Sequence, residues 1–416
     1  MRVRAPLKKT AAIIGFLSLV PGAYFGSAYV SSYLKDISYE RPAVATTTPE
    51  TRRPAATHVV LPEPVKAIYM TACVASSPSW RKQLVALVDE TELNSIVVDI
   101  KDYTGTISFV PEHPLLKENK GTGCRAKDMR EFVEELHTHG IYAIGRITVF
   151  QDPYYTKIRP DLAVKSRSTG DVWKDYKGLS FIDIGAKEYW NYIVALSDEA
   201  YREVGFDELN YDYIRFPSDG NMKDVDYSWS TTTTKALALR NFYEYLHARV
   251  KPTGAMLSAD LFGMVTTNYD DLNIGQVLEH ALPYFDFISP MVYPSHYPPN
   301  FNGWKNPNLH VYDVVNFSMS RAVTRTEATT TPLVLPGGER IASTTPARYT
   351  KPAYDRKKLR PWLQDFSYGG TYGAAEVRAQ IQATYDAGLT SWMLWDPANS
   401  YTREALLPAP PTASAQ

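Results

Sequence analysis

Between residues 65 and 402, eight short segments rich in β-forming residues alternate with amphipathic helical stretches. Alternating strands and helices predict a parallel sheet, and eight such units close as a (β/α)8 TIM barrel of the α/β class. A doubly wound open sheet is the structural alternative, because spacing alone does not prove closure. The expected strands are residues 67–72, 95–102, 141–150, 208–216, 256–262, 285–293, 360–366 and 391–396. The helical stretches between them include residues 80–93, 127–139, 187–204, 235–250 and 374–387.

The first 37 residues have the pattern of an export signal. Arg2, Arg4, Lys8 and Lys9 precede an uncharged stretch, residues 11–34, which exceeds the about 20 residues that a membrane-spanning helix needs. Positive charge before such a stretch predicts that the N-terminus stays inside and that the rest of the chain is translocated. A cleaved signal peptide is the alternative. In both cases we expect an extracytoplasmic protein, anchored to the cell membrane by its N-terminal helix or secreted.

Three other stretches show no hydrophobic period. Residues 38–64 are rich in Pro, Thr and Ala, which predicts a linker between the anchor and the barrel. Residues 403–416 are expected to form a disordered tail. Residues 328–351 have Pro, Gly and Thr in bulk, and we interpret them as an insertion between the sixth and seventh strands, either a lid or a partly disordered loop.

Charge and metal-ligand patterns narrow the function classes. The formal net charge is −1, from 44 basic and 45 acidic side chains, whereas a nucleic-acid-binding protein normally has a basic excess or stripe. The eight His residues form no ligand-spaced cluster, so neither a metal nor another cofactor is expected. Cys73 and Cys124 lack the spacing of a zinc site; a disulfide and two separate thiols are both consistent with the sequence.

The order of side chains along the strands indicates where a site would lie. Successive residues of a strand point to opposite faces. On one face of the second to fifth strands the residues are small or apolar, whereas the other face gains polar and charged groups toward the C-terminal end. In a barrel this end is the mouth where active sites lie. The pattern places around that mouth Asp99, Lys101, Arg146, Asp212, Asp260 and, from the sixth strand, Tyr293.

Two carboxylates on neighbouring strands suit glycosidic bond cleavage, in which one is ionised and the other donates a proton. We assign the ionised role to Asp212, because Lys101 and Arg146 are expected to keep it charged. Asp260 is assigned as the acid. Its proton would be retained through repulsion by Asp212 and through the apolar surroundings supplied by Phe262 and Met264.

Further side chains near the predicted mouth are candidates for substrate contacts. Asp365, after the seventh strand, is expected to orient sugar hydroxyls as a third catalytic-site carboxylate, and aromatic rings are expected to stack on sugar rings. The predicted substrate-binding residues are Asp99, Lys101, Arg146, Asn210, Arg215, Tyr293, His296, Tyr297, Trp395 and Asp396.

Four segments resemble a family of bacterial glycosyl hydrolases with an alpha-amylase-like barrel, a domain of unknown function. The most specific is GFDELNYDYIRFP, residues 205–217, and the others are residues 258–263, 288–297 and 360–366. The resemblance extends over about residues 66–400. By analogy with alpha-amylases, it implies that Asp212 is the nucleophile, that Asp260 takes the place of their acid and that Asp365 takes that of their third carboxylate.

This chain departs from the amylase pattern at two positions. Asp260 stands where those enzymes have a Glu, and Asn210 stands where they have an Arg two residues before the nucleophile. Asp is one methylene shorter than Glu, so the gap to the scissile bond can differ, and the choice between retention and inversion stays open.

The sequence therefore predicts a glycoside hydrolase that cleaves an extracellular or cell-envelope polysaccharide. The alternative is a non-catalytic carbohydrate-binding barrel tethered at the cell surface, since a fold alone does not determine function. A separation of Asp212 and Asp260 beyond about 10 Å would exclude their direct cooperation in hydrolysis. The sequence predicts neither the sugar nor the oligomeric state.

Overall fold

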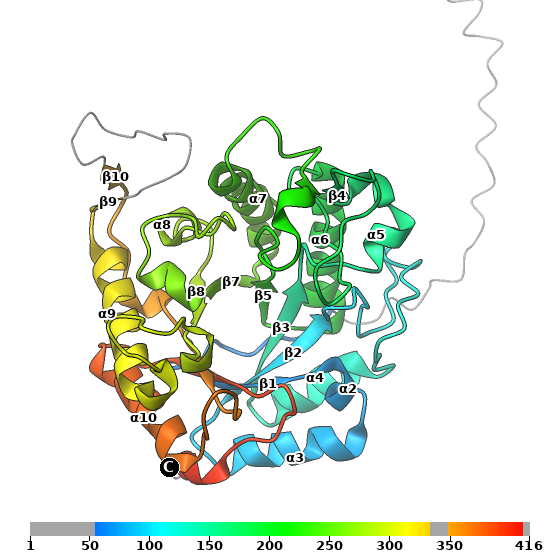
Figure 1. Cartoon of the computed structure of the whole chain (residues 1–416). Coiled ribbons are helices and arrows are strands. Elements are labelled where there is room, and N and C mark those ends of the chain that lie inside the picture. The colour runs from blue at the N-terminus through cyan, green and yellow to red at the C-terminus, as the bar shows by residue number, and fades with distance from the viewer. Residues whose placement is uncertain (1–54, 333–347, 411–416) are drawn as a thin grey trace, which may run out of the picture. The chain divides into compact units, whose positions relative to one another are not determined.

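Eight parallel strands form a closed barrel in the computed structural model of the chain, which describes residues 55–332 and 348–410 (Figure 1). The order around the barrel is β1-β2-β3-β5-β7-β8-β11-β12, with β12 pairing back onto β1. Closure excludes the doubly wound open sheet. The strands are β1 (Lys66–Met70), β2 (Ser95–Lys101), β3 (Tyr142–Thr148), β5 (Glu208–Asp212), β7 (Met256–Phe262), β8 (Phe287–Met291), β11 (Trp362–Gln364) and β12 (Trp392–Trp395).

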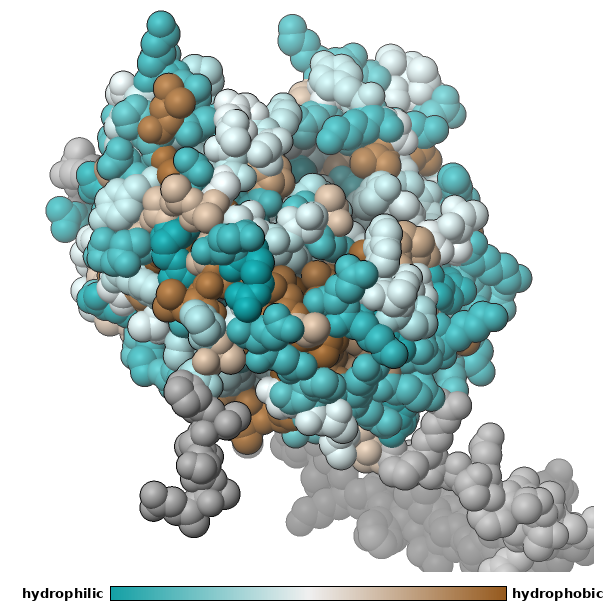
Figure 2. Space-filling view, turned by 90° about the horizontal axis from the view of Figure 1, so that it is seen from below, coloured by the Kyte–Doolittle hydropathy of each residue, from teal (hydrophilic) through white to brown (hydrophobic). Residues whose placement is uncertain are grey.

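Helices surround the barrel, one in each connection between successive barrel strands (Figure 1). They are α3 (Pro78–Asp89), α4 (Met129–Thr138), α6 (Lys187–Glu199), α7 (Lys235–Val250), the single-turn α8 (Leu278–Ala281), α9 (Val311–Glu327) and α10 (Ala374–Asp386). All five predicted helical stretches are confirmed. The sequence analysis missed α9, which packs beside α10 (Figure 1). The polar sides of such helices face solvent, and the surface seen from below is largely hydrophilic, with apolar residues in small groups (Figure 2).

The predicted alternation of side chains is confirmed by two separate apolar layers. Ile96 and Val98 of β2 lie in the large layer between strands and helices, whereas Val97 packs inside the barrel. On β3, Ala143 lies in the outer layer and Ile144 in the inner one. Polar residues that share the inner phase at the C-terminal ends of these strands must therefore meet near the barrel axis.

Two short antiparallel sheets lie outside the barrel. β4 (Lys165–Ser166) pairs with β6 (Val225–Asp226) and joins the connections that follow β3 and β5. A small cluster around Trp173 and Phe181 packs beneath this sheet. β9 (Thr330–Pro332) pairs with β10 (Arg348–Thr350) within the predicted insertion 328–351. The remainder of that insertion, including any lid, lies outside the described residues.

The barrel extends further at both ends than the sequence analysis expected. Residues 55–64 of the predicted linker lie against it, because Val59 and Leu61 pack on the inner apolar cluster and the Val59 N–H donates to Asp207 (2.9 Å). Residues 403–410 of the predicted tail also pack on it, since Leu406 is buried and Ala409 N–H bonds to the Glu90 carbonyl (3.1 Å). In both segments apolar side chains such as Leu61 and Leu406 contact the barrel, which a Pro-rich composition did not indicate.

The predicted anchor, residues 1–37, and most of the linker lie outside the described residues. Within residues 55–332 and 348–410, no helix combines the length and apolar character needed to cross a bilayer.

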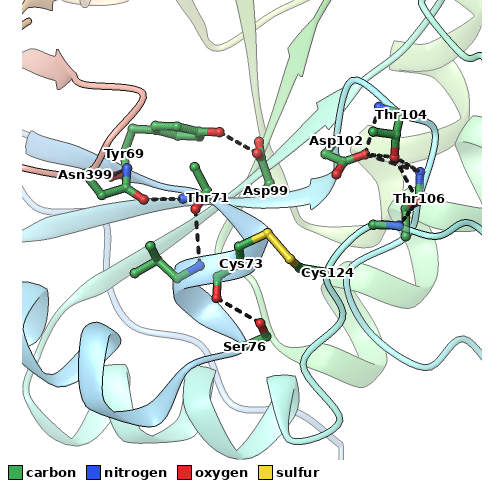
Figure 3. The surroundings of a disulfide bond; sticks show 12 residues. Tyr69, Thr71, Cys73, Ser76, Asp99, Asp102, Thr104, Thr106, Cys124 and Asn399 are labelled. Carbon is green, nitrogen blue, oxygen red and sulfur yellow. Dashed lines mark hydrogen bonds between the residues drawn. A yellow bond between two sulfur atoms is a disulfide. The ribbon is translucent and has the colours of Figure 1, made fainter.

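Cys73 and Cys124 form a disulfide, which settles the alternative that the sequence left open (Figure 3). Cys73 belongs to α2 (Ala72–Ala75), directly after β1, and Cys124 lies in the connection between β2 and α4. The bond therefore joins the connections that follow β1 and β2 at the C-terminal end of the barrel, close to Tyr69 and Asp99 (Figure 3).

Candidate active site

A pocket of about 370 Å³ opens at the C-terminal ends of the barrel strands. Strands β3, β5 and β7 each contribute an ionisable residue to it, and β8, β11 and β12 contribute apolar or aromatic ones. This is the end at which barrel enzymes carry their active sites. The lining residues are Arg146, Asp212, Tyr213, Arg215, Asp219, Asp260, Phe262, Gly263, Met264, Met291, Tyr293, His296, Tyr297, Trp362 and Trp395.

The guanidinium of Arg146 is the centre of the charged cluster. Its Nη1 donates to Asp99 Oδ1 (2.6 Å), and its Nε (3.2 Å) and Nη2 both donate to Asp212 Oδ2. Its Nε is also 3.9 Å from Asp260 Oδ2. One buried cation therefore serves three carboxylates from β2, β5 and β7.

The two predicted catalytic carboxylates are neighbours. Their Oδ2 atoms lie 3.2 and 3.9 Å from the same nitrogen, Nε of Arg146, so they are at most 7.1 Å apart, the sum of those distances. This limit is well inside the about 10 Å beyond which cooperation becomes implausible. A separation within this limit is compatible with a retaining enzyme, whose carboxyls lie about 5–5.5 Å apart. It is also compatible with the shorter separations of inverting enzymes, which range over about 6.5–9.5 Å.

The surroundings of Asp260 favour its protonated form at neutral pH. Burial raises its pKa to about 8, and the negative charge of Asp212 acts in the same direction. Three residues oppose this shift in pKa. Arg146 does so by its positive charge, and Asn210 Nδ2 and Trp362 Nε1 each donate a hydrogen bond of 2.8 Å to Oδ1 of Asp260. Asp212 and Asp260 thus have unequal environments, although they are neighbours.

The backbone after β5 fixes the orientation of Asp212. Tyr213 has a φ of 50°, in the left-handed region that residues with a Cβ seldom adopt. The Tyr213 N–H donates to Asp212 Oδ1 at 2.5 Å. Asp212 therefore has its two oxygens bonded to different donors, Oδ2 to Arg146 and Oδ1 to this N–H, while it lines the pocket. Local strain of this kind is common at functional sites.

Asp99 contacts the Arg146 guanidinium outside the pocket lining. Its Oδ2 accepts a hydrogen bond from the Tyr69 hydroxyl (2.5 Å; Figure 3), and burial raises its pKa. The Tyr69 ring stacks on Trp395 with centroids 3.9 Å apart, and the Arg146 guanidinium carbon is 5.0 Å from the Trp395 ring centre. Asp99 does not line the pocket, so it positions Arg146 and does not reach substrate there.

Four of the predicted substrate-binding residues carry rings that line the pocket. They are Tyr293, His296, Tyr297 and Trp395. The Tyr297 hydroxyl bonds to Ser318 Oγ (2.9 Å), so Tyr297 presents its ring to the pocket. Rings arranged in this way are suited to stacking on the C–H faces of a sugar.

Lys101 is not in the site, contrary to the sequence prediction. It is fully buried, its Nζ lies 2.9 Å from Asp152, and it donates to the Thr148 carbonyl (2.6 Å). A register shift between Asp99 and Lys101 pairs Lys101 with Ile147 of the outer layer. The irregularity thus reverses the expected phase of Lys101. Among residues 55–332 and 348–410, Arg146 is the cation that forms an ion pair with Asp212.

Asp365 and Asp396 lie beside the pocket and not in it. Asp365 follows β11 in the phase of Leu363, an outer-layer residue, and its two oxygens accept bonds from Thr402 N (3.0 Å) and Oγ1 (2.6 Å). Burial raises its pKa to about 6. Both carboxylates line an adjoining hollow that shares Asp219, His296 and Trp395 with the pocket.

Sequence reasoning missed two residues of the cluster, Trp362 and Tyr69. Trp362 donates to Asp260, and Tyr69 donates to Asp99. The inward phase of β11, in which Trp362 faces the interior, was the available signal for the first. Nothing in the sequence around Tyr69 indicated its partner, because that partner lies 30 residues away on another strand.

Two solved glycoside hydrolase domains are similar to this chain, and the first of them shares its fold. The PgaB (BpsB) glycoside hydrolase domain from Bordetella bronchiseptica has a TM-score of 0.56 at 14% identity, covering 82% of this chain and 97% of that one. The glycoside hydrolase domain of PelA from Pseudomonas aeruginosa has a TM-score of 0.42 at 10% identity, covering 83% and 98%.

A hypothetical protein from Ruminiclostridium thermocellum is 32% identical, with a TM-score of 0.42, over 46% of this chain and 96% of that one. No curated protein matches the chain. Residues 67–401 match the model of a family described as "Putative glycosyl hydrolase domain", and the chain belongs to that family.

Proposed function

We propose that this protein is a glycoside hydrolase in which Asp260 is the general acid and Asp212 is the nucleophile or general base. The observation that supports this most strongly is the unequal environment of two neighbouring carboxyls. Asp212 accepts bonds from Arg146 and a backbone N–H, whereas burial raises the pKa of Asp260 to about 8. Glycosidic cleavage requires one ionised and one protonated carboxyl, and unequal environments favour this division of roles.

In the proposed reaction, Asp260 donates its proton to the glycosidic oxygen as the bond from that oxygen to the anomeric carbon breaks. Asp212 either forms a bond to the anomeric carbon as the leaving oxygen departs, or it removes a proton from the water that attacks this carbon. In the first course Asp260, now ionised, removes a proton from a water that attacks the anomeric carbon and breaks its bond to Asp212, which restores both carboxyls. Arg146 remains bound to the Asp212 carboxylate throughout and keeps it oriented. The limit of 7.1 Å between the Oδ2 atoms, from their distances of 3.2 and 3.9 Å to Arg146 Nε, is compatible with both courses.

The adjoining hollow supports a polymeric substrate. It is lined by polar and aromatic side chains, among them Asp365, Tyr368 and Asp396, and it meets the pocket along Asp219, His296 and Trp395. A chain of sugars with one unit at the two carboxyls would place further units there. In this proposal Asp365 and Asp396 bind hydroxyl groups of the polymer, and Asp365 acts beside the catalytic pair without touching the scissile bond.

We also propose that the protein acts outside the cytoplasmic membrane, tethered or exported by its N-terminal segment. The Cys73–Cys124 disulfide supports this location, because disulfides persist mainly in oxidising compartments. A polysaccharide of the cell envelope or its surroundings is then the accessible substrate.

The test is to incubate the full chain with a panel of envelope polysaccharides and to measure new reducing ends. We expect release by the wild type and a loss of about 10³-fold or more in Asp212→Asn and Asp260→Asn. Asp198→Asn, at a side chain 47% exposed on α6, is the matched control and should retain full activity.

The carbohydrate-binding alternative makes the opposite prediction. A barrel that only binds would retain polysaccharide without releasing reducing ends, and Asp212→Asn and Asp260→Asn would leave its behaviour unchanged. Activity in both Asn variants equal to that of Asp198→Asn would contradict the proposed catalytic pair.

A further inference from the structure

Arg215 differs from the other buried arginines of the described residues. It is only 7% exposed and lines the pocket, yet it makes no ion pair within residues 55–332 and 348–410. Each of the others has a carboxylate partner: Arg81 pairs with Asp128, Arg146 with Asp99 and Asp212, Arg325 with Glu279 and Arg360 with Glu208. A buried charge without a partner is unfavourable unless a ligand supplies one.

The contacts of Arg215 hold its guanidinium in a defined place and leave donors unused. Its guanidinium carbon is 5.0 Å from the Tyr213 ring centre and 4.8 Å from that of Phe262. Nη1 donates to the Phe216 carbonyl (3.1 Å) and to Ser218 Oγ (3.2 Å). The N–H groups on Nε and Nη2 make no hydrogen bond to the described residues, so two adjacent donors remain for a ligand in the pocket.

The nearby acidic residues do not satisfy this charge. Burial lowers the pKa of Arg215 and outweighs the opposite influence of Tyr213, Asp212 and Asp219. Asp219, an exposed residue, accepts a hydrogen bond from Ser218 (2.9 Å). Asp212 is already bonded by Arg146 and by the Tyr213 N–H. The guanidinium is therefore positioned before any ligand arrives, which reduces the entropy lost on binding.

We propose that Arg215 binds an anionic group on the sugar unit that occupies the pocket, so that the substrate is an acidic glycan. A planar guanidinium with two adjacent free N–H groups matches a carboxylate, as in a uronic acid, in a bidentate pair. A sugar phosphate offers the same chemistry. The inference rests on the proposed function for the identity of the ligand as a sugar, and it adds the class of sugar.

The experiment measures binding and does not depend on turnover. The full chain is titrated with D-glucuronate, D-glucose 6-phosphate and D-glucose, and saturation-transfer NMR reports occupancy. We expect at least one of the anions to bind about tenfold or more tightly than glucose. Arg215→Gln should remove this preference and leave glucose binding within about twofold.

Two control variants separate the role of Arg215 from other effects. Lys120→Gln removes a different positive charge, on a side chain that is 79% exposed and lies outside both the pocket and the adjoining hollow, and should leave the anion preference intact. Arg215→Lys keeps the charge without the planar pair of donors and should bind the anion with intermediate strength. Removing a buried, unpaired charge should not lower the unfolding temperature, and circular dichroism checks that each variant is folded.

The outcomes are distinguishable from those of the hydrolysis assay. Preference for an anion that is lost in Arg215→Gln supports the inference even if no polysaccharide is cleaved. No anion binding better than glucose, or equal preference in Arg215→Gln and the wild type, overturns it even if a neutral glycan is hydrolysed. Relative binding of glucuronate and glucose 6-phosphate identifies whether the anionic group is a carboxylate or a phosphate.

Discussion

Two acidic residues of β5, Glu208 and Asp212, both face the barrel interior but have different surroundings. Glu208, at the start of the strand, pairs with Arg360, and both side chains are 0% exposed. Asp212, at the end of the strand, shares Arg146 with Asp99 and lines a pocket.

The comparison distinguishes a structural ion pair from a reactive cluster. The Glu208–Arg360 pair, here called the lower pair, lies at the N-terminal end of the barrel. It has one cation and one carboxylate, both buried from solvent, with the Tyr142 hydroxyl 3.4 Å from Glu208. The upper cluster, at the C-terminal end, has three carboxyls around the Arg146 guanidinium and access to a cavity, and this surplus of negative charge favours retention of a proton on one of them. Matched charge at the N-terminal end of a barrel stabilises the fold, whereas surplus ionisable groups at the C-terminal end indicate chemistry.

The largest expected effect on stability is in the lower pair. Glu208→Gln leaves Arg360 as a buried, uncompensated charge, and we expect it to lower the free energy of unfolding by about 3–5 kcal/mol. Activity per folded molecule should change little. Urea denaturation measures the first quantity, and reducing-end release at a temperature where the variant is folded measures the second.

Glu188→Gln is the control for that variant, because Glu188 is 59% exposed in its pair with Arg159 and should contribute under about 1 kcal/mol. A loss of activity in Glu208→Gln comparable to that of Asp212→Asn, with little loss of stability, would contradict the distinction between the two ends.

In the upper cluster the effect on stability should have the opposite sign. The pKa of Asp260 is raised from 3.8 to about 8, so the folded state favours its proton. Between these pH values the wild type loses stability as the pH rises, because the unfolded state releases a proton that the folded state retains. Asn carries no such penalty, and we expect Asp260→Asn to unfold at a higher temperature than the wild type at pH 8.

The difference in unfolding temperature should shrink as the pH falls toward 4. Differential scanning calorimetry at several pH values measures it, and Asp198→Asn should show no pH-dependent gain. A variant Asp260→Asn that is less stable than the wild type at pH 8 would indicate that the carboxylate form of Asp260 is favoured by folding.

The pH dependence of activity should reflect the same proton. As the pH rises through about 8, Asp260 loses the proton that it must donate, so kcat/KM should decrease above that pH. The measurement is a pH–rate profile from pH 5 to 10 with a polysaccharide that the wild type cleaves. A profile that already falls between pH 5 and 6 would assign the acid role to another group.

A smaller change is expected from Trp362→Phe. This variant removes one of the two hydrogen bonds that favour the ionised form of Asp260, so the pKa should rise and the alkaline decrease should move up by less than about one pH unit. The same pH profile detects it. An unchanged or downward shift would mean that the indole N–H does not act on Asp260.

The barrel and the charged centre of the site could be predicted from local patterns in the sequence. The period of two along each strand was sufficient to bring Arg146, Asp212 and Asp260 together, because a barrel converts a shared phase into proximity. Tyr293 followed from the same argument, whereas Trp395 was predicted only as an aromatic ring near the mouth.

The errors occurred where that pattern is interrupted. Lys101 follows a register shift, which no sequence signal marks, and so turns to Asp152. Asp365 lies one step past the end of β11 in the outer phase. The contacts of Trp362 and Tyr69 join strands that are distant in sequence, so they depend on the closed barrel and not on any local pattern.

The most direct test of the account is the titration of the Asp260 carboxyl itself. With ¹³C-labelled Asp side chains in the full chain, NMR should show a carboxyl that titrates near pH 8 and is absent from Asp260→Asn. In Asp212→Asn this titration should move to lower pH, because the neighbouring negative charge is gone. A carboxyl of Asp260 that titrates near 4 in the wild type, or that does not respond to Asp212→Asn, would contradict the central claim.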